Sequence, residues 1–226
     1  WGLNSSGQVG DGTTITRNRP VQVVDLTGVV AVAAGATHSL ALKSDGTVWS
    51  WGSNANGELG DGTTMARATA GAVKNLTGVI LIAAAENHNL AVKGDGTVWT
   101  WGSNASGELG DGTTTARSTP VQVAGVTNVI AAATGTAVSL AVKADGTVWG
   151  WGSNIDKQLG DTGTAPHLEP VQVPNVSRVT DIAAGASHVL ALLGDGSVVG
   201  WGRNYSGALG IGYQTPSTYK IGRAHV

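Results

Sequence analysis

Histidine recurs in this chain at intervals of fifty residues, and imidazole is a side chain that binds metals and transfers protons. The series consists of His38, His88 and His188, with Val138 at the remaining position. Metal ligands must converge on one ion at distances of ~2 Å, whereas equivalent positions of neighbouring repeats are spread around an axis. We therefore predict local structural hydrogen bonds for these histidines and no metal site.

Aspartate recurs with the same period, in Gly-Asp-Gly or Gly-Asp-Thr turns. The residues are Asp11, Asp61, Asp111 and Asp161. A calcium loop of the EF-hand type needs carboxylates at alternate positions and a terminal glutamate, and neither follows in this sequence. We interpret these residues as turn-forming aspartates, because an aspartate side chain bonds its own backbone two residues further on.

The other side chains that catalyse reactions form no recognisable arrangement. Serine and threonine are abundant, but no histidine and carboxylate are placed to activate one of them. The sequence also lacks a glycine-rich phosphate loop with a lysine. We therefore expect a protein that is not an enzyme and that needs no cofactor.

A basic series follows the Gly-Asp-Gly-Thr-Thr turns, in the stretch that varies most between repeats. Its members are Arg17, Arg67 and Arg117, with His167 at the next period. Loops on a rigid scaffold tend to carry recognition residues, so one interpretation is a basic row that meets an acidic partner protein. The alternative pairs each arginine with a nearby aspartate such as Asp11 or Asp61, in surface ion pairs worth ~0 to 1 kcal/mol. We favour the ion pairs, because exposed arginines are ordinary on protein surfaces.

The elements that position these residues come from the fifty-residue repeat. Trp-Gly pairs begin at Trp1, Trp51, Trp101, Trp151 and Trp201. Four stretches per unit have the length and β-branched content of strands, namely residues 29–35, 38–43, 47–52 and, in the register of the preceding unit, 20–23. The pair Asp45-Gly46 between the second and third stretches predicts a tight hairpin, because it accepts positive φ at low cost.

The third stretch shows how such strands pack. Side chains two apart point the same way, so Trp49 and Trp51 share one face and Ser50 and Gly52 the other. We expect each sheet to be bulky on one face and small on the other. Such sheets bury both faces by stacking on copies of themselves, as the blades of a β-propeller do.

At this point the sequence resembles a known family. The segment AAGATHSLALKSDGTVWSWGSNANGELGDG, residues 33–62, resembles the RCC1 repeat, the unit of seven-bladed propellers related to the regulator of chromosome condensation. The resemblance covers essentially residues 1–216. It implies an all-β, RCC1-like propeller, here an incomplete arc of about four four-stranded antiparallel blades. The blades are predicted at residues 29–73, 79–123, 129–173 and from 179 onward, preceded by an outer-strand stub at 20–23.

We assign residues 1–220 to one propeller domain, with units 1–50, 51–100, 101–150, 151–200 and a partial unit 201–220. Residues 221–226, IGRAHV, break the repeat and match a translated sequencing adapter, so we interpret them as a non-native tail. The alternative is a divergent natural tail. Together with the missing initial methionine, the tail predicts a gene fragment of bacterial or environmental origin.

Composition limits the partners. The chain carries 13 Lys and Arg and 15 Asp and Glu with no dense basic run, which opposes nucleic-acid binding. No apolar run approaches the ~20 residues of a membrane span. The absence of cysteine fits the cytosol or an exported bacterial protein, and we favour an extracellular or cell-surface bacterial location. An arc leaves two blade faces unburied, so we expect self-association of the chain alone.

The resemblance implies a non-catalytic scaffold that binds another protein through loops on a rigid ring. One alternative is guanine-nucleotide exchange on a small GTPase, the activity of the founding family member. That activity relies on loop residues and an inserted wedge that match nothing in this sequence. Another alternative is an extracellular adhesive or structural repeat array.

Overall fold

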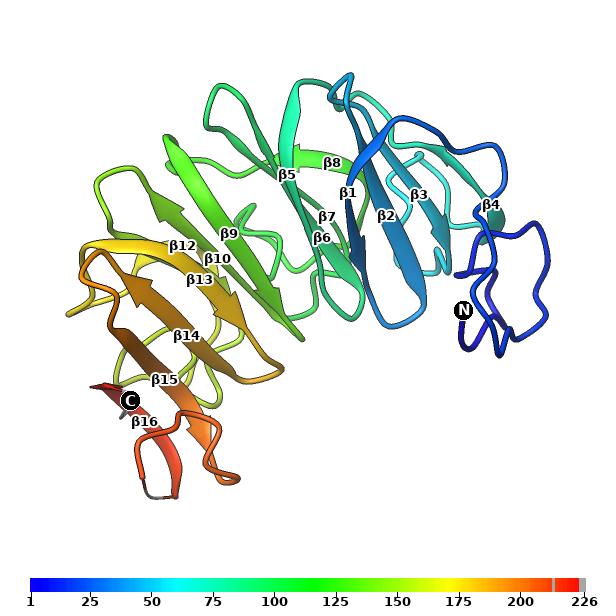
Figure 1. Cartoon of the computed structure of the whole chain (residues 1–226). Coiled ribbons are helices and arrows are strands. Elements are labelled where there is room, and N and C mark those ends of the chain that lie inside the picture. Colours follow the sequence, from blue (N-terminus) through cyan, green and yellow to red (C-terminus); the bar gives the residue numbers. More distant parts are fainter. Residues whose placement is uncertain (213, 224–226) are drawn as a thin grey trace.

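The computed structural model describes residues 1–212 and 214–223, and strands β1 to β16 are its regular elements (Figure 1). The first two sheets contain β1 (Val29–Ala34), β2 (His38–Lys43), β3 (Val48–Gly52) and β4 (Arg67–Ala72), then β5 (Val79–Ala84), β6 (His88–Lys93), β7 (Val98–Gly102) and β8 (Arg117–Gln122). The other two contain β9 (Val129–Gly135), β10 (Val138–Lys143), β11 (Val148–Gly152) and β12 (His167–Gln172), then β13 (Val179–Ala184), β14 (His188–Leu193), β15 (Val198–Asn204) and β16 (Thr215–Arg223). Within this described part, no helix is long and apolar enough to cross a membrane.

Each sheet is an antiparallel meander of four consecutive strands, which confirms the predicted blades. The hairpin between β2 and β3 shows why the sequence folds this way. Gly46 has a φ of +77°, and Asp45 Oδ1 accepts hydrogen bonds from the backbone N (3.0 Å) and Oγ1 (2.6 Å) of Thr47. The Asp-Gly pair therefore makes the tight turn that the sequence predicts.

The strand register corrects the expectation of one bulky and one small face. Ala41 lies opposite Trp49, and Leu40 lies opposite Ser50. Residues paired across antiparallel strands point to the same face, so each face carries one bulky and one small strand. Blades interlock because Trp101 of the second blade packs in one buried cluster with Leu40 of the first.

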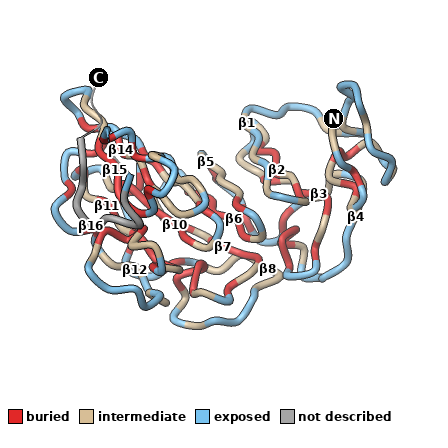
Figure 2. The backbone as a smooth tube through the Cα atoms, turned by 90° about the horizontal axis from the view of Figure 1, so that it is seen from below, coloured by how far each residue is buried: buried red, intermediate tan, exposed pale blue. Residues whose placement is uncertain are grey.

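The four blades stack in sequence order around an axis and form an open arc, as predicted (Figure 2). The inner strands β1, β5, β9 and β13 line the concave side, and β4, β8 and β12 lie at the outside (Figures 1 and 2). Buried clusters between successive blades form the core, so the faces of the sheets are buried by neighbouring units rather than by a second layer.

The predicted outer strand at residues 20–23 is wrong, since this segment forms no strand. Only an isolated bridge joins Gly2 to Arg17, at the position where Gly52 pairs with Arg67 in the first blade. An outer strand forms by pairing with the third strand of its blade. In the described chain, only the Gly2 bridge stands where that third strand would lie, so residues 20–23 have no strand to pair with.

The outer strands of the complete blades begin three residues earlier than predicted. They start at Arg67, Arg117 and His167, so these side chains lie on strands and not in loops. The proposed tail, residues 221–226, lies partly in β16, which completes the fourth sheet, and residues 224–226 lie outside the described residues. Its non-native origin stays a prediction.

Candidate functional site

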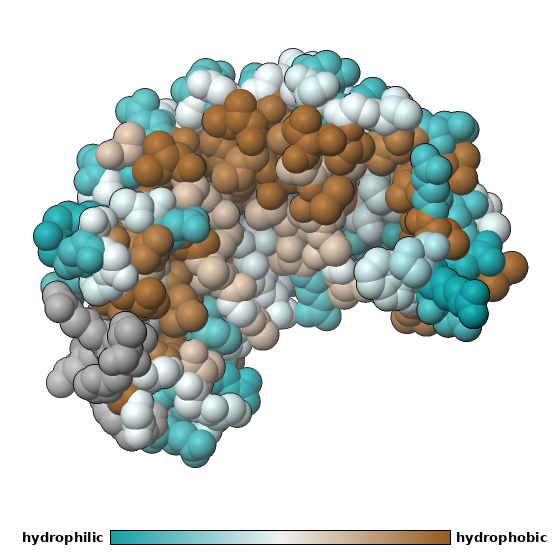
Figure 3. Space-filling view, viewed as in Figure 1, coloured by the Kyte–Doolittle hydropathy of each residue, from teal (hydrophilic) through white to brown (hydrophobic). Residues whose placement is uncertain are grey.

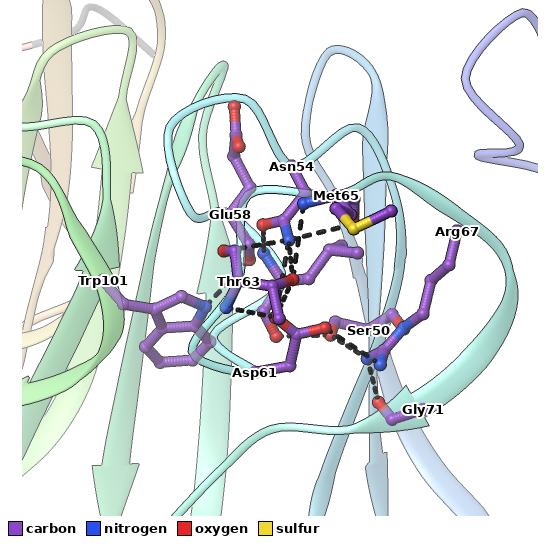
Figure 4. Close-up of polar contacts among 10 residues, drawn as sticks. Ser50, Asn54, Glu58, Asp61, Thr63, Met65, Arg67, Gly71 and Trp101 are labelled. Atoms are coloured by element: carbon purple, nitrogen blue, oxygen red, sulfur yellow. Dashed lines mark hydrogen bonds and ion pairs between the residues drawn. The ribbon is translucent and has the colours of Figure 1, made fainter.

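A buried asparagine organises the loop between the third and outer strands of each blade (Figure 4). Asn54 Nδ2 donates toward the backbone O of Thr63 (3.1 Å) and of Met65 (3.1 Å), and Asp61 Oδ1 lies 3.4 Å away. Asn54 Oδ1 accepts from Leu59 N at 2.9 Å. Equivalent networks surround Asn4, Asn104 and Asn154. A side-chain amide thus fills the oxygen-lined centre of these loops.

The aspartates of these loops are turn residues, as predicted. Asp61 Oδ1 accepts from the backbone N (2.9 Å) and Oγ1 (2.7 Å) of Thr63. Burial raises the pKa of the Asp61 carboxyl, but the hydrogen bonds from Thr63 and the charge of Arg67 outweigh it, so the pKa lies below its ordinary value. The pKa of Asp11 is lowered to about 2, mainly by the hydrogen bond from the hydroxyl of Thr13 and further by Arg17. The described residues contain no group of three or more metal-binding side chains.

Each member of the basic row pairs with the aspartate of its own loop. The pairs are Arg17 with Asp11, Arg67 with Asp61, Arg117 with Asp111, and His167 with Asp161. Arg67 also donates to the backbone O of Ser50 (3.1 Å), which ties the outer strand to β3, and to the backbone O of Gly71 (2.7 Å) in its own strand (Figure 4). The predicted pairs between arginine and aspartate are therefore confirmed. A partner-binding role for the row stays a prediction.

The predicted structural hydrogen bonds are confirmed for two histidines, and they join neighbouring blades. His38 Nε2 donates to Asn89 Oδ1 at 2.7 Å, because an amide oxygen only accepts. His88 Nε2 lies 2.9 Å from Ser139 Oγ, which donates its own hydrogen to the backbone O of Glu108 (2.8 Å), so His88 is the donor. Burial lowers the pKa of His88 to about 3, and it also lowers the pKa of His38.

A carbonyl of each loop anchors the next blade. The backbone O of Glu58 accepts from Trp101 Nε1 (2.9 Å) and from Asn89 Nδ2 (2.8 Å). Equivalent bonds join Trp151 and Ser139 to Glu108, and Trp201 to Gln158. Where the third and fourth blades meet, Val138 and Val189 replace the polar pair and lie in one buried cluster. Hydrogen bonds between units therefore pair most of the buried polar groups at the junctions, whereas Nδ1 of His38 and Nδ1 of His88 are buried without a partner among the described residues.

Sequence reasoning missed an exposed apolar row on the inner strands. Its members are Val30, Ile80 and Ile130, whose exposed fractions are 63%, 62% and 52%. Val79 pairs with Lys93, and Leu81 pairs with the adjacent residue of β6, so Ile80 between them has no partner. An extra residue of this kind is a β-bulge, which turns its side chain away from the sheet. Figure 3 shows apolar surface gathered over the beginnings of β1, β5 and β9.

A signal for this apolar row exists in the sequence. Each inner strand opens with two consecutive β-branched residues, as in Val79-Ile80, which breaks the alternation of a regular strand. The fourth blade has Thr180 at the same bulge, and its Oγ1 donates to the backbone O of Leu192 at 3.3 Å. A threonine therefore fits the position without disturbing the blade.

Four-stranded antiparallel sheets stacked around an axis, with loop networks repeated from blade to blade, define this chain as part of a β-propeller. The model of the regulator of chromosome condensation (RCC1) repeat matches residues 1–42, 45–92, 95–142 and 145–192. A second model of the same description matches residues 29–58, 79–108 and 179–208. The chain therefore belongs to the RCC1 repeat family, as the sequence resemblance implies.

Solved structures agree with this assignment. A chain in the crystal structure of Kap60 bound to yeast RCC1 (Prp20) matches with a TM-score of 0.88 at 25% identity, covering 100% of this chain and 57% of that chain. Prp20p from Saccharomyces cerevisiae gives 0.88 at 27% identity, covering 100% and 58%. Human WBSCR16 gives 0.85 at 28% identity, covering 99% and 61%. The chain thus spans about three fifths of the length of these structures.

Proposed function

We propose that this chain is a non-catalytic protein-binding scaffold and that the apolar row binds a protein partner with an apolar contact surface. One observation carries the proposal, namely that three adjacent blades expose a β-branched side chain at the same bulge. Burial of such a side chain is worth ~1.5 to 3 kcal/mol, so a rigid row of three gives a partner substantial binding energy.

Two further observations support this role. The hydrogen bonds between blades hold the row on a preorganised frame, which reduces the entropy lost on binding. Among the solved structures, RCC1 (Prp20) is bound to Kap60, and Prp20p is described with binding properties toward Gsp1p and histones. Protein binding is therefore a property of propellers similar to this one, and we extend that property to this chain.

The test compares partner capture by the native chain and by the triple variant Val30→Thr, Ile80→Thr, Ile130→Thr. Thr180 provides the natural precedent for each change, so the variant is expected to fold. A loss of about 1 kcal/mol at each position weakens binding by a factor of about 10². Equal affinity of the two proteins for a captured partner would contradict the proposal.

The matched control replaces exposed apolar residues outside the apolar row. Met65 and Ile155 are exposed by 76% and 71% and lie in loops between third and outer strands. The double variant Met65→Thr, Ile155→Thr removes a similar apolar area, and we expect it to bind the partner as the native chain does. Reduced binding by this control alone would assign the interface to the loops instead.

The other functions predicted from the sequence are tested with the same proteins. Accelerated release of a fluorescent nucleotide from a small GTPase would favour the exchange factor. Open-ended self-assembly without a discrete partner would favour the adhesive array. Loss of partner binding on changing Arg67 and Arg117 to Ala would favour the basic row, and unchanged binding would eliminate it.

A further inference from the structure

The loop of the first blade contains an Asn-Gly pair, and no other pair of this kind occurs in the sequence. It is Asn56-Gly57, whereas the equivalent positions of the other units hold Ser6, Ser106, Asp156 and Ser206. Glycine has no side chain to hinder the approach of its backbone nitrogen to the amide carbon of a preceding asparagine. This is the sequence in which an asparagine side chain most readily loses ammonia.

The surroundings of Asn56 make such a loss consequential. Asn56 is exposed, but its amide Nδ2 donates to Glu58 Oε1 at 2.8 Å and its backbone N donates to Glu58 Oε2 at 2.9 Å. Glu58, in contrast, is buried, with an exposed fraction of only 1%. A carboxylate only accepts hydrogen bonds, so this contact depends on one hydrogen from the Asn56 side-chain amide and one from its backbone N, and only the backbone hydrogen survives deamidation.

The other units show that the chain avoids two carboxylates at this contact. Asp156 of the third blade stands beside Gln158, and its backbone N donates to Gln158 Oε1 at 2.9 Å. Glu108 of the second blade stands beside Ser106, whose backbone N donates to Glu108 Oε2 at 2.7 Å. Every unit that has an acidic residue at the position of Asn56 or at the position of Glu58 has a neutral residue at the other of these two positions.

We propose that Asn56-Gly57 is a spontaneous deamidation site and that the product destabilises the junction between the first and second blades. The backbone nitrogen of Gly57 attacks Asn56 Cγ, the bond from Cγ to the side-chain nitrogen breaks, and ammonia leaves with the Gly57 amide proton. Water then opens the cyclic imide to aspartate or isoaspartate. The new carboxylate faces Glu58 at a partly buried contact, where two like charges repel and neither side chain supplies a hydrogen.

The damage reaches the blade junction through Glu58, whose carbonyl anchors Trp101 and Asn89 of the second blade. The same loop controls the rate of the reaction. Gly57 N donates to the backbone O of Asn54 at 3.0 Å, so the attack requires this bond to open first. We expect slower conversion in the folded chain than in the unfolded chain, governed by local opening of the loop.

Mass spectrometry of the chain after incubation in mildly alkaline buffer, with and without urea, measures the reaction. We expect the peptide that contains Asn56 to gain about one mass unit and to release ammonia in both conditions, faster in urea. Asn56→Ser, which copies Ser106, removes the gain and serves as the control. No conversion in the folded chain, over a time in which the urea-unfolded chain converts fully, would overturn the proposed site.

A second measurement isolates the role of Glu58. We expect Asn56→Asp to lower the urea concentration at the unfolding midpoint, followed by tryptophan fluorescence. The double variant Asn56→Asp, Glu58→Gln copies Asp156 with Gln158 and is expected to restore the midpoint. A midpoint unchanged by Asn56→Asp, or one that Glu58→Gln fails to recover, would overturn the proposed destabilisation.

Discussion

Acidification is expected to weaken the chain through His88 before it affects the aspartates. Burial lowers the pKa of His88 from its ordinary 6.5 to about 3. Below pH ~6.5 the unfolded chain takes up a proton at this position and the folded chain does not. The free energy of unfolding therefore falls as the pH drops from 6.5 toward 3. The stability that depends on a neutral His88 is fully present only above the pKa of this histidine in the unfolded chain.

The size of the effect follows from the shift. One histidine that titrates only in the unfolded state costs about 1.4 kcal/mol per pH unit, which is about 2 kcal/mol at pH 5 and about 4 kcal/mol near pH 3. The lowered pKa of Asp61 and of similar aspartates acts in a different window, since carboxylates begin to titrate in the unfolded chain only near pH ~4. The range from pH 6.5 to 5 therefore reports on buried histidine.

The chain itself supplies the comparison. The double variant His88→Val, Ser139→Val copies Val138 and Val189, the apolar pair at the junction of the third and fourth blades. Urea unfolding of both proteins at pH 7, 6 and 5, followed by tryptophan fluorescence, gives two slopes of unfolding free energy against pH. His38 is present in both proteins, so its contribution cancels in the difference.

We expect the native slope to exceed that of the double variant by about 1.4 kcal/mol per pH unit below pH 6. Single variants test the pairing separately, because either change alone leaves a buried polar group without its partner at a cost of ~1 to 3 kcal/mol. Equal slopes for the two proteins, or a native chain that gains stability on acidification, would refute this account of His88.

Three further predictions concern the frame. Trp101→Phe removes the bond to Glu58 and is expected to cost about 1 kcal/mol or more in urea unfolding. Trp49→Phe loses a 3.3 Å contact with a threonine hydroxyl and is expected to cost less, and equal losses would contradict the anchoring role. Arg67→Met is expected to cost ~1 to 3 kcal/mol because three bonds from Arg67 to Ser50 join the outer strand to β3, whereas Arg117→Met is expected to cost only ~0.5 to 1 kcal/mol. The reverse order would show that ion pairing dominates. The chain expressed alone is expected to self-associate through its open blade faces, measured by light scattering at several concentrations, and a monodisperse monomer throughout would exclude this.

The sequence by itself determines the blade. A fifty-residue period, Asp-Gly hairpins and short β-branched stretches specify four antiparallel strands per unit, because turn chemistry and strand propensity act over a few residues. The same local patterns identify the aspartates as turn residues. This prediction holds because an aspartate turn depends on contacts within one repeat.

Only the tertiary structure decides what the repeated positions contact. The register that sets Trp49 beside Ala41 depends on how two strands align, and periodicity along one strand does not contain it. The same holds for His38 and Asn89, which are fifty-one residues apart and meet only because one blade stacks on the next. Ile80 is exposed for a similar reason, since a bulge is a mismatch between two strands and not a property of either one. Pairing between distant segments therefore determines both the junctions and the surface that we assign to a partner.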